Sequence, residues 1–310
     1  MKKIIAILLC AAALLCTLAS CGGAKDDKSQ YPKIATTSHV VADWTKNILD
    51  GAYDEFEMTL LSDVGKDMHN FQPSAQDIMS IATADLVIYV GGESDKWVED
   101  AVKSTGGKVK TLKLIELVEE HTAECEDDHD HTHGADEHIW LSFENAVKCV
   151  SAISDAICEI DGDNSESYVA NAEAYTAKLN GLFDEYKAAV AAAKYKTLVF
   201  ADRFPFVYLM NELELEYFAA FPGCSAETTA SFETVITLAS KVDELGLPCV
   251  LVISNSADGI SKTVVENTKS KNAAILELDS MQVWAKTEFD YIESAKNNLT
   301  VFKFALGCEE

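Results

Sequence analysis

Short apolar runs and helical repeats alternate along most of this chain. Runs rich in Val, Ile, Leu and Phe predict eight strands, at 33–37, 55–61, 86–90, 111–114, 197–200, 216–221, 249–253 and 274–278. Apolar residues at spacings of three and four predict helices at 41–49, 74–82, 96–104, 144–160, 204–211, 232–245, 259–268 and 290–306. Strands that alternate with helices form parallel sheets. We therefore expect an α/β fold of two lobes, each with a four-stranded, mainly parallel sheet flanked by helices.

A single long helix is predicted between the two sets of strands. Apolar or aromatic residues recur there at Tyr168, Ala172, Tyr175, Leu179, Leu182, Tyr186 and Val190. A helix over 165–193 would be roughly 43 Å long. We expect it to be a rigid connection, over 163–194, between lobes at 32–162 and 195–310, although a helix packed wholly within one lobe would have the same pattern.

The first residues have the pattern of an export signal. Two lysines precede an apolar run, and the stretch "LASC" ends at Cys21. We expect a signal peptide over 1–20 and a lipid-modified Cys21, followed by a polar tether over 21–31. The protein would then be extracytoplasmic and anchored by lipid to the bacterial cell membrane. The alternative is an ordinary secretory signal in which Cys21 has no role.

The charge of the chain excludes one class of partner. The formal net charge is −26, from 51 acidic and 25 basic residues. Such a charge repels nucleic acid, so we expect no nucleic-acid partner.

Histidines and carboxylates are predicted to gather at one edge of the sheets. In open α/β sheets, ligands bind beyond the carboxyl ends of the strands. The residues that follow strand ends or enter from the same side are His39, His69, His138, Asp202, Glu227 and Asp279. Two or more imidazoles with carboxylates indicate a site for Zn²⁺, and a larger share of carboxylates favours Mn²⁺. Each residue alone also has an ordinary structural reading as a turn, cap or surface residue.

A second group of candidate ligands lies in the polar loop 119–134. Its histidines stand among many acidic residues, at His121, His129, His131 and His133. Tracts of this composition bind metal ions loosely. We expect an accessory metal-binding loop, and the alternative is a solvated acidic loop.

Three stretches of the chain are similar to the motifs of a known family. "GKDMHNFQPSAQDI" with "ADLVIYVGG" resembles the family pattern G-x-D-P-H-x-[FY]-x-P-x-x-x-D-[IV] followed by A-D-L-[IV]-[IV]-Y-x-G. "DEHIWLSFENA" and "ELDSM" resemble two further stretches. The chain thus resembles the ZnuA- and TroA-like solute-binding lipoproteins, which carry zinc or manganese for ABC importers.

The resemblance implies a set of metal ligands with one gap. It makes His69, His138 and Asp279 three of four ligands. The family has His or Glu at the remaining position, where this chain has Ala201 in "VFADRFPF". Asp202 is the expected substitute, with Glu227 in reserve and His39 as a further candidate.

The resemblance also implies a function. The protein would capture a divalent ion, Zn²⁺ or alternatively Mn²⁺, in the cleft between its lobes. It would deliver the ion to the membrane subunits of an ABC permease, acting as a monomer and without catalysis. Less favoured readings are a surface metallohydrolase and a surface adhesin or zinc store. The chain lacks the H-E-x-x-H motif of many such hydrolases.

A disulfide between Cys249 and Cys308 is the last expectation. Cys249 begins a predicted strand and Cys308 follows the last predicted helix, so both belong to the edge opposite the ligands. Zinc-type relatives resemble this chain in having Cys at both places. The alternative is a pair of buried thiols.

Overall fold

The computed structural model describes residues 31–62, 65–119, 136–222, 230–256, 259–283 and 288–309. Cys21, Glu227 and the four loop histidines lie outside these ranges, as do the expected signal peptide and nearly all of the tether. Residues 32–310 form one compact unit. Within the described residues, no helix has the length and apolar character needed to cross a bilayer.

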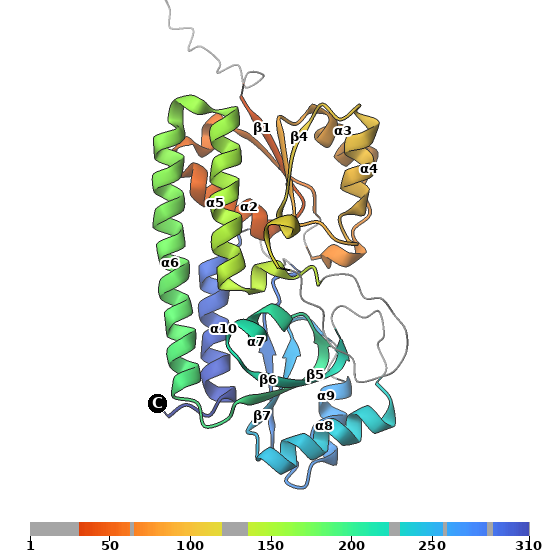
Figure 1. Cartoon of the computed structure of the whole chain (residues 1–310). Coiled ribbons are helices and arrows are strands. Elements are labelled where there is room, and N and C mark those ends of the chain that lie inside the picture. Colours follow the sequence, from red (N-terminus) through yellow and green to blue (C-terminus); the bar gives the residue numbers. More distant parts are fainter. Residues whose placement is uncertain are drawn as a thin grey trace, which may run out of the picture. The chain divides into compact units, whose positions relative to one another are not determined.

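Two four-stranded parallel sheets form the two lobes (Figure 1). The first has the order β2 (Glu57–Leu60), β1 (Lys33–Thr36), β3 (Leu86–Tyr89), β4 (Lys110–Lys113). The second has the order β6 (Glu216–Pro222), β5 (Thr197–Phe204), β7 (Cys249–Ile253), β8 (Ala274–Leu278). Every pairing is parallel. The predicted fold class is confirmed.

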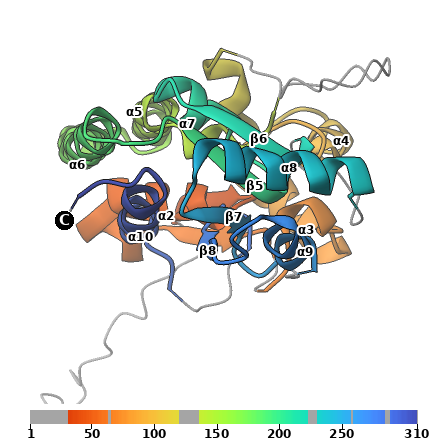
Figure 2. The ribbon, with the colours of Figure 1, turned by 90° about the horizontal axis from the view of Figure 1, so that it is seen from below.

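Helices cover both faces of each sheet. They are α2 (His39–Leu49), α3 (Ala75–Thr83), α4 (Lys96–Ser104), α5 (Phe143–Ile160), α6 (Ser165–Ala191), α7 (Val207–Glu212), α8 (Phe232–Leu245), α9 (Gly259–Asn267) and α10 (Tyr291–Ala305). β3 and β7 are buried along their whole length, as strands covered on both faces should be. Figure 2 shows α8 and α9 on the side of the molecule away from α6 and α10.

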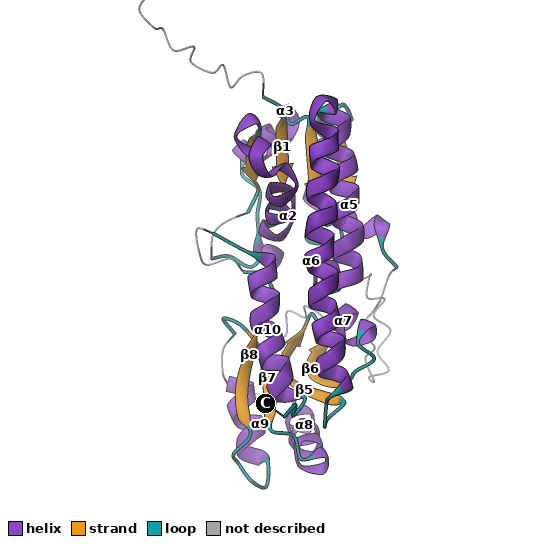
Figure 3. Ribbon diagram, turned by 90° about the vertical axis from the view of Figure 1, so that its left-hand side faces the viewer, coloured by secondary structure: helices purple, strands orange, loops and turns teal. Residues whose placement is uncertain are grey.

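The long helix α6 contacts both lobes (Figure 3). Near its middle, the Tyr175 hydroxyl donates to Asp43 Oδ2 of α2 over 3.1 Å. Further along, the Tyr186 hydroxyl donates to the Ala295 carbonyl of α10 over 2.7 Å. The helix therefore joins the lobes and is not confined to one of them.

Strand β5 is longer than the sequence pattern predicts. It continues to Phe204, and α7 begins only at Val207. The pairing with β6 shifts between Phe200 and Arg203 and then resumes. Pro205 follows the strand, and a residue before proline favours extended backbone over helix. Asp202 consequently lies within a strand and not beyond its end.

The predicted disulfide is not formed. Cys249 and Cys308 are both thiols, and burial raises the pKa of Cys249 to about 12. The Cys308 thiol donates to the Ala189 carbonyl of α6 over 3.3 Å. The chain end is tied beside α6, because the Leu306 carbonyl accepts from the backbone N–H groups of residues 194 and 195. Cys308 therefore contacts α6.

Candidate metal centre

His69 lies in a short 3₁₀ turn, Met68–Asn70, that follows β2. Asp67 caps this turn, because its Oδ1 accepts from the backbone N–H of His69 over 3.1 Å. On the ring, Nδ1 lies 2.6 Å from the Ser94 hydroxyl oxygen. That contact fixes the orientation of the imidazole and leaves Nε2 on its far side.

His138 is fixed in a similar way just before α5. The Asp136 carboxylate accepts from the backbone N–H of His138 over 2.8 Å and lies 2.6 Å from its ring Nδ1. The side chain is almost fully buried. A carboxylate on one ring nitrogen orients an imidazole and raises the basicity of the other nitrogen, as in many metal sites.

The two imidazoles meet through their Nε2 atoms, which lie 3.2 Å apart. Zn–N bonds of 2.0–2.1 Å in a tetrahedral site place two ligand nitrogens about 3.4 Å apart. The separation in this protein is therefore close to that of two ligands on one ion.

Gln282 completes this cluster and was not predicted from the sequence. Its side chain is 2% exposed. Its amide nitrogen lies 3.4 Å from His69 Nε2 and also contacts His138 Nε2. It stands three residues after Asp279, directly after the quoted stretch "ELDSM". A neutral amide does not by itself indicate a metal site. The sequence therefore pointed to Gln282 only through its position next to the stretch "ELDSM".

The structure does not bring Asp202 and Asp279 to the histidine pair. Among the described residues, no three His, Cys, Asp or Glu side chains are grouped so that they could hold a metal ion. Asp202 uses its carboxylate on backbone N–H groups, from Ile253 over 3.0 Å and from Arg203 over 2.7 Å. Asp279 accepts from the backbone N–H of Met281 over 2.8 Å.

The other two positions considered from the sequence are part of the packed interior. His39 packs edge-on against Phe289, with ring centroids 4.6 Å apart, and burial lowers its pKa to about 4. Ala201 belongs to the apolar cluster formed with α8 and α9, whereas its neighbour Phe200 faces the opposite side of the sheet. The strand therefore directs position 201 into the core. Glu227 lies outside the described residues.

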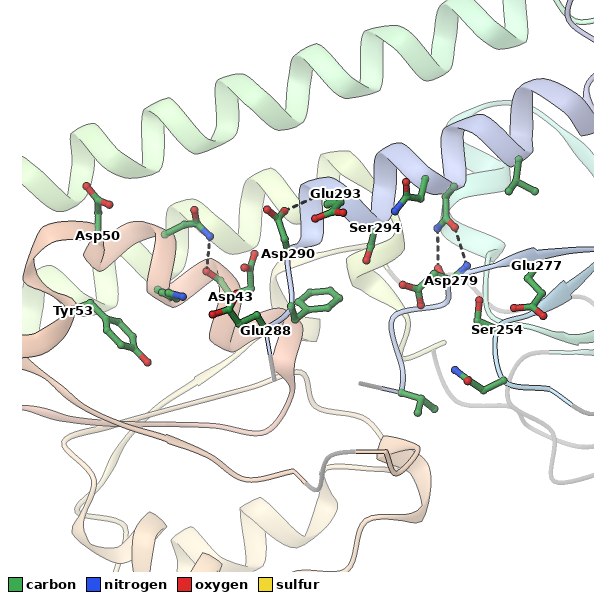
Figure 4. Close-up of a pocket in the computed structure, with 18 of the residues that line it drawn as sticks. Asp43, Asp50, Tyr53, Ser254, Glu277, Asp279, Glu288, Asp290, Glu293 and Ser294 are labelled. Carbon is green, nitrogen blue, oxygen red and sulfur yellow. Dashed lines mark hydrogen bonds between the residues drawn. The ribbon is translucent and has the colours of Figure 1, made fainter. Parts of the chain in front are cut away.

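Asp279 instead lines an acidic cavity of about 1370 Å³ (Figure 4). The cavity also takes carboxylates from α2 and from the start of α10, including Asp43, Asp290 and Glu293. Its described lining residues include neither His69 nor His138.

The histidine pair lies where the lobes touch. Arg203 of the second lobe reaches Asp67, with Nη1 3.4 Å from Oδ2, and Asp67 caps the His69 turn. Asp67 also forms an isolated antiparallel bridge with Val283. Residues 67 and 203 thus tie the His69 turn to the lobe that carries Gln282.

A comparison of the sequence with models of protein families identifies the family of this chain. A model described as "ZnuA: Zinc-uptake complex component A periplasmic" matches residues 34–305. The chain belongs to this family.

Two relatives in this ZnuA family illustrate the likeness. The zinc-binding protein AdcA of Streptococcus pyogenes serotype M1 is 27% identical over 289 residues, covering 87% of this chain and 55% of the relative. The high-affinity zinc uptake system protein ZnuA of Bacillus subtilis is 28% identical over 312 residues, covering 95% of each chain. The chain thus spans about half the length of the AdcA relatives and nearly the whole of the other.

Solved structures of the family share the fold. Zn(II)-bound AdcA of Streptococcus pneumoniae has a TM-score of 0.71 and 25% identity, over 89% of this chain and 58% of that one. The periplasmic zinc-binding protein TroA of Treponema pallidum has a TM-score of 0.73 and 19% identity, over 89% of this chain and 99% of that one. Within this family, our chain has Ala201 buried in the core and Gln282 against the histidine pair.

Proposed function

We propose that this protein binds Zn²⁺ between its lobes and delivers it to the membrane subunits of an ABC permease. The supporting observation is the pair of imidazole Nε2 atoms 3.2 Å apart. Relatives named as zinc-binding or zinc-uptake proteins cover most of this chain. Imidazole ligands favour Zn²⁺, and Mn²⁺ is the alternative cargo.

The residues next to the two histidines orient both imidazoles for binding a cation. Ser94 and Asp136 engage the Nδ1 atoms, so both Nε2 atoms are directed to one point. The Gln282 carboxamide adjoins that point and has an oxygen that can serve as a neutral ligand. A carboxylate would complete a tetrahedral set. Asp279, Asp202 and Glu227 remain the candidates that we propose for it.

Removal of one histidine tests this function. His69→Ala should weaken Zn²⁺ binding by more than about a hundredfold. Removing a direct ligand lowers the affinity more than removing a residue that only orients a ligand. Asn70→Ala, an exposed change at the next residue, is the control. Competition titration with a zinc chelator measures both affinities. Unchanged affinity in folded His69→Ala protein would end the proposal.

The same titration identifies the completing acid. Asp202→Ala, Asp279→Ala and Glu227→Ala are compared side by side. Asp202→Ala should in addition destabilise the fold by about 1–3 kcal/mol, because it leaves the buried Ile253 N–H without its acceptor.

We also propose that Cys21 carries a lipid anchor that keeps the protein at the outer surface of the cell membrane. The stretch "LASC" and the polar residues after it support this proposal. Cys21→Ser protein should move from the detergent phase to the aqueous phase in a Triton X-114 partition. Retention in the detergent phase would contradict the anchor.

A further inference from the structure

The segment that carries His138 is held largely by the other lobe. We call residues 136–144 the ligand segment. The Tyr208 hydroxyl of α7 donates to the Asp136 carbonyl over 2.8 Å. The Trp140 indole N–H donates to the Ser280 carbonyl, which follows β8, over 3.0 Å. The Tyr291 hydroxyl at the start of α10 donates to the Trp140 carbonyl over 2.6 Å.

Glu212 makes two further attachments. It is the last residue of α7, and its two carboxylate oxygens accept from the first two N–H groups of α5. The distances are 3.0 Å from Phe143 N and 2.7 Å from Glu144 N. Ser142 caps the third N–H, that of Asn145. A helix has unpaired N–H groups at its start, and here the second lobe supplies two of the three acceptors.

We infer that Glu212 is a positioning residue for metal binding, because it docks the ligand segment on the lobe that carries Gln282. The inference rests on the proposed function for its effect on zinc. Trp140 and Ser280 each stand two residues from a member of the site, His138 and Gln282 respectively. Docking of the segment therefore sets how closely Gln282 approaches the histidine pair, and undocking opens the site for release.

The charge of Glu212 makes this docking sensitive to pH. The pKa of Glu212 is raised to about 7, chiefly by burial, and the charge of Glu144 acts in the same direction. The N–H groups of Glu144 and Phe143 and the Ser142 hydroxyl lower it. The charge of Glu212 in turn contributes to the raised pKa of the neighbouring Tyr291 hydroxyl.

The sign follows from the direction of this shift. An undocked, hydrated Glu212 has an ordinary pKa near 4.5. Protonation therefore favours the docked segment, and this contribution is lost as the pH rises through about 7.

Hydrogen exchange in metal-free protein tests the docking directly. The reporter is the Trp140 indole N–H, which Glu212 does not touch. Glu212→Ala should speed its exchange by about tenfold, because two N–H groups of α5 lose their acceptors. Glu212→Gln keeps one acceptor and carries no charge. Near pH 5, the Trp140 indole N–H of this variant should therefore be as well protected from exchange as that of the wild type. Glu214→Gln, an exposed change two residues away, is the control.

The pH profile separates positioning from a merely local role. Between about pH 4.5 and pH 7 the wild-type protection should fall after correction for intrinsic exchange, whereas that of Glu212→Gln should stay constant. Zn²⁺ should leave Glu212→Ala about tenfold faster than the wild type in a chelator-capture experiment. Unaltered Trp140 exchange in Glu212→Ala, or parallel pH profiles of wild type and Glu212→Gln, would overturn the inference. Failure of zinc binding in the wild type would refute the proposed function and leave the exchange result standing.

Discussion

Single side-chain atoms decide which of the polar residues can reach a metal ion. His69 and His138 have one ring nitrogen engaged by Ser94 or Asp136, and the other nitrogens face one another. Asp202 has both carboxylate oxygens engaged by backbone N–H groups. A carboxylate that satisfies a buried backbone donor has a structural role, because losing the bond to Ile253 would leave a buried N–H unpaired.

Gln282 offers a test at this scale. Gln282→Glu places a negative charge against both imidazoles, so Zn²⁺ should bind at least about tenfold more tightly. Gln282→Ala should bind more weakly than the wild type. Competition titration at pH 7.5 measures both variants, and Gln76→Glu, the same change at an exposed position of α3, is the matched control. Equal affinity of Gln282→Glu and wild type would show that the amide is not close to the bound ion.

At the scale of elements, α6 joins the two lobes through buried polar contacts as well as apolar ones. One of these is the bond from Tyr175 to Asp43 of α2. Burial raises the pKa of Asp43 to about 6, the charge of Asp290 adds to this, and the Tyr175 hydroxyl opposes it. The contact between α2 and α6 therefore contains an acid that is more easily accommodated in its protonated form.

Asp43→Asn should reveal this cost of ionisation. A raised pKa means that protonation stabilises the fold below about pH 4 and that this contribution is lost as the pH rises through 6. The neutral variant should exceed the wild type in stability by up to about 3 kcal/mol at pH 7.5, and the difference should shrink toward pH 4. Urea unfolding at both pH values measures it, with the exposed change Asp54→Asn as control. A wild type as stable as the variant at pH 7.5 would contradict the assignment.

At the scale of the whole molecule, one apolar core continues through both lobes along α6. It includes Ile88 of the first sheet, Leu179 of α6 and Leu251 of the second sheet. The ligand segment and the Asp67 turn add polar contacts between the lobes. The histidine pair therefore belongs to a region that both lobes build.

Deletion of residues 119–134 should therefore separate two classes of bound ion. The tight Zn²⁺ should remain, because His69 and His138, which contact each other, lie outside the deleted residues. Weakly bound ions should be lost, since histidines in a polar, acidic tract bind metal loosely. Isothermal titration of the two proteins counts both classes. Loss of the tight ion on deletion would make the loop a part of the main site.

The sequence by itself determined the secondary structure and the class of fold. The runs that became β3 and β7 are continuously apolar, and the α6 pattern repeats at helical spacing over its whole length. These signals are local, because the spacing of apolar residues along a short stretch indicates which faces of a strand or helix are buried. His69 and His138 were also visible, since each stands beside a recognisable stretch.

Only the tertiary structure decided which polar groups meet. Asp202 and Asp279 follow the same sequence rule as the histidines, yet one is bonded to β7 and the other lines the acidic cavity. Gln282 contacts the histidine pair, although glutamine is not a residue type that indicates a metal site. Cys308 contacts α6 where a bridge to Cys249 was expected. Contacts between residues far apart in the chain depend on strand pairing and helix docking, and these are set by packing of the whole molecule and not by any short stretch of sequence.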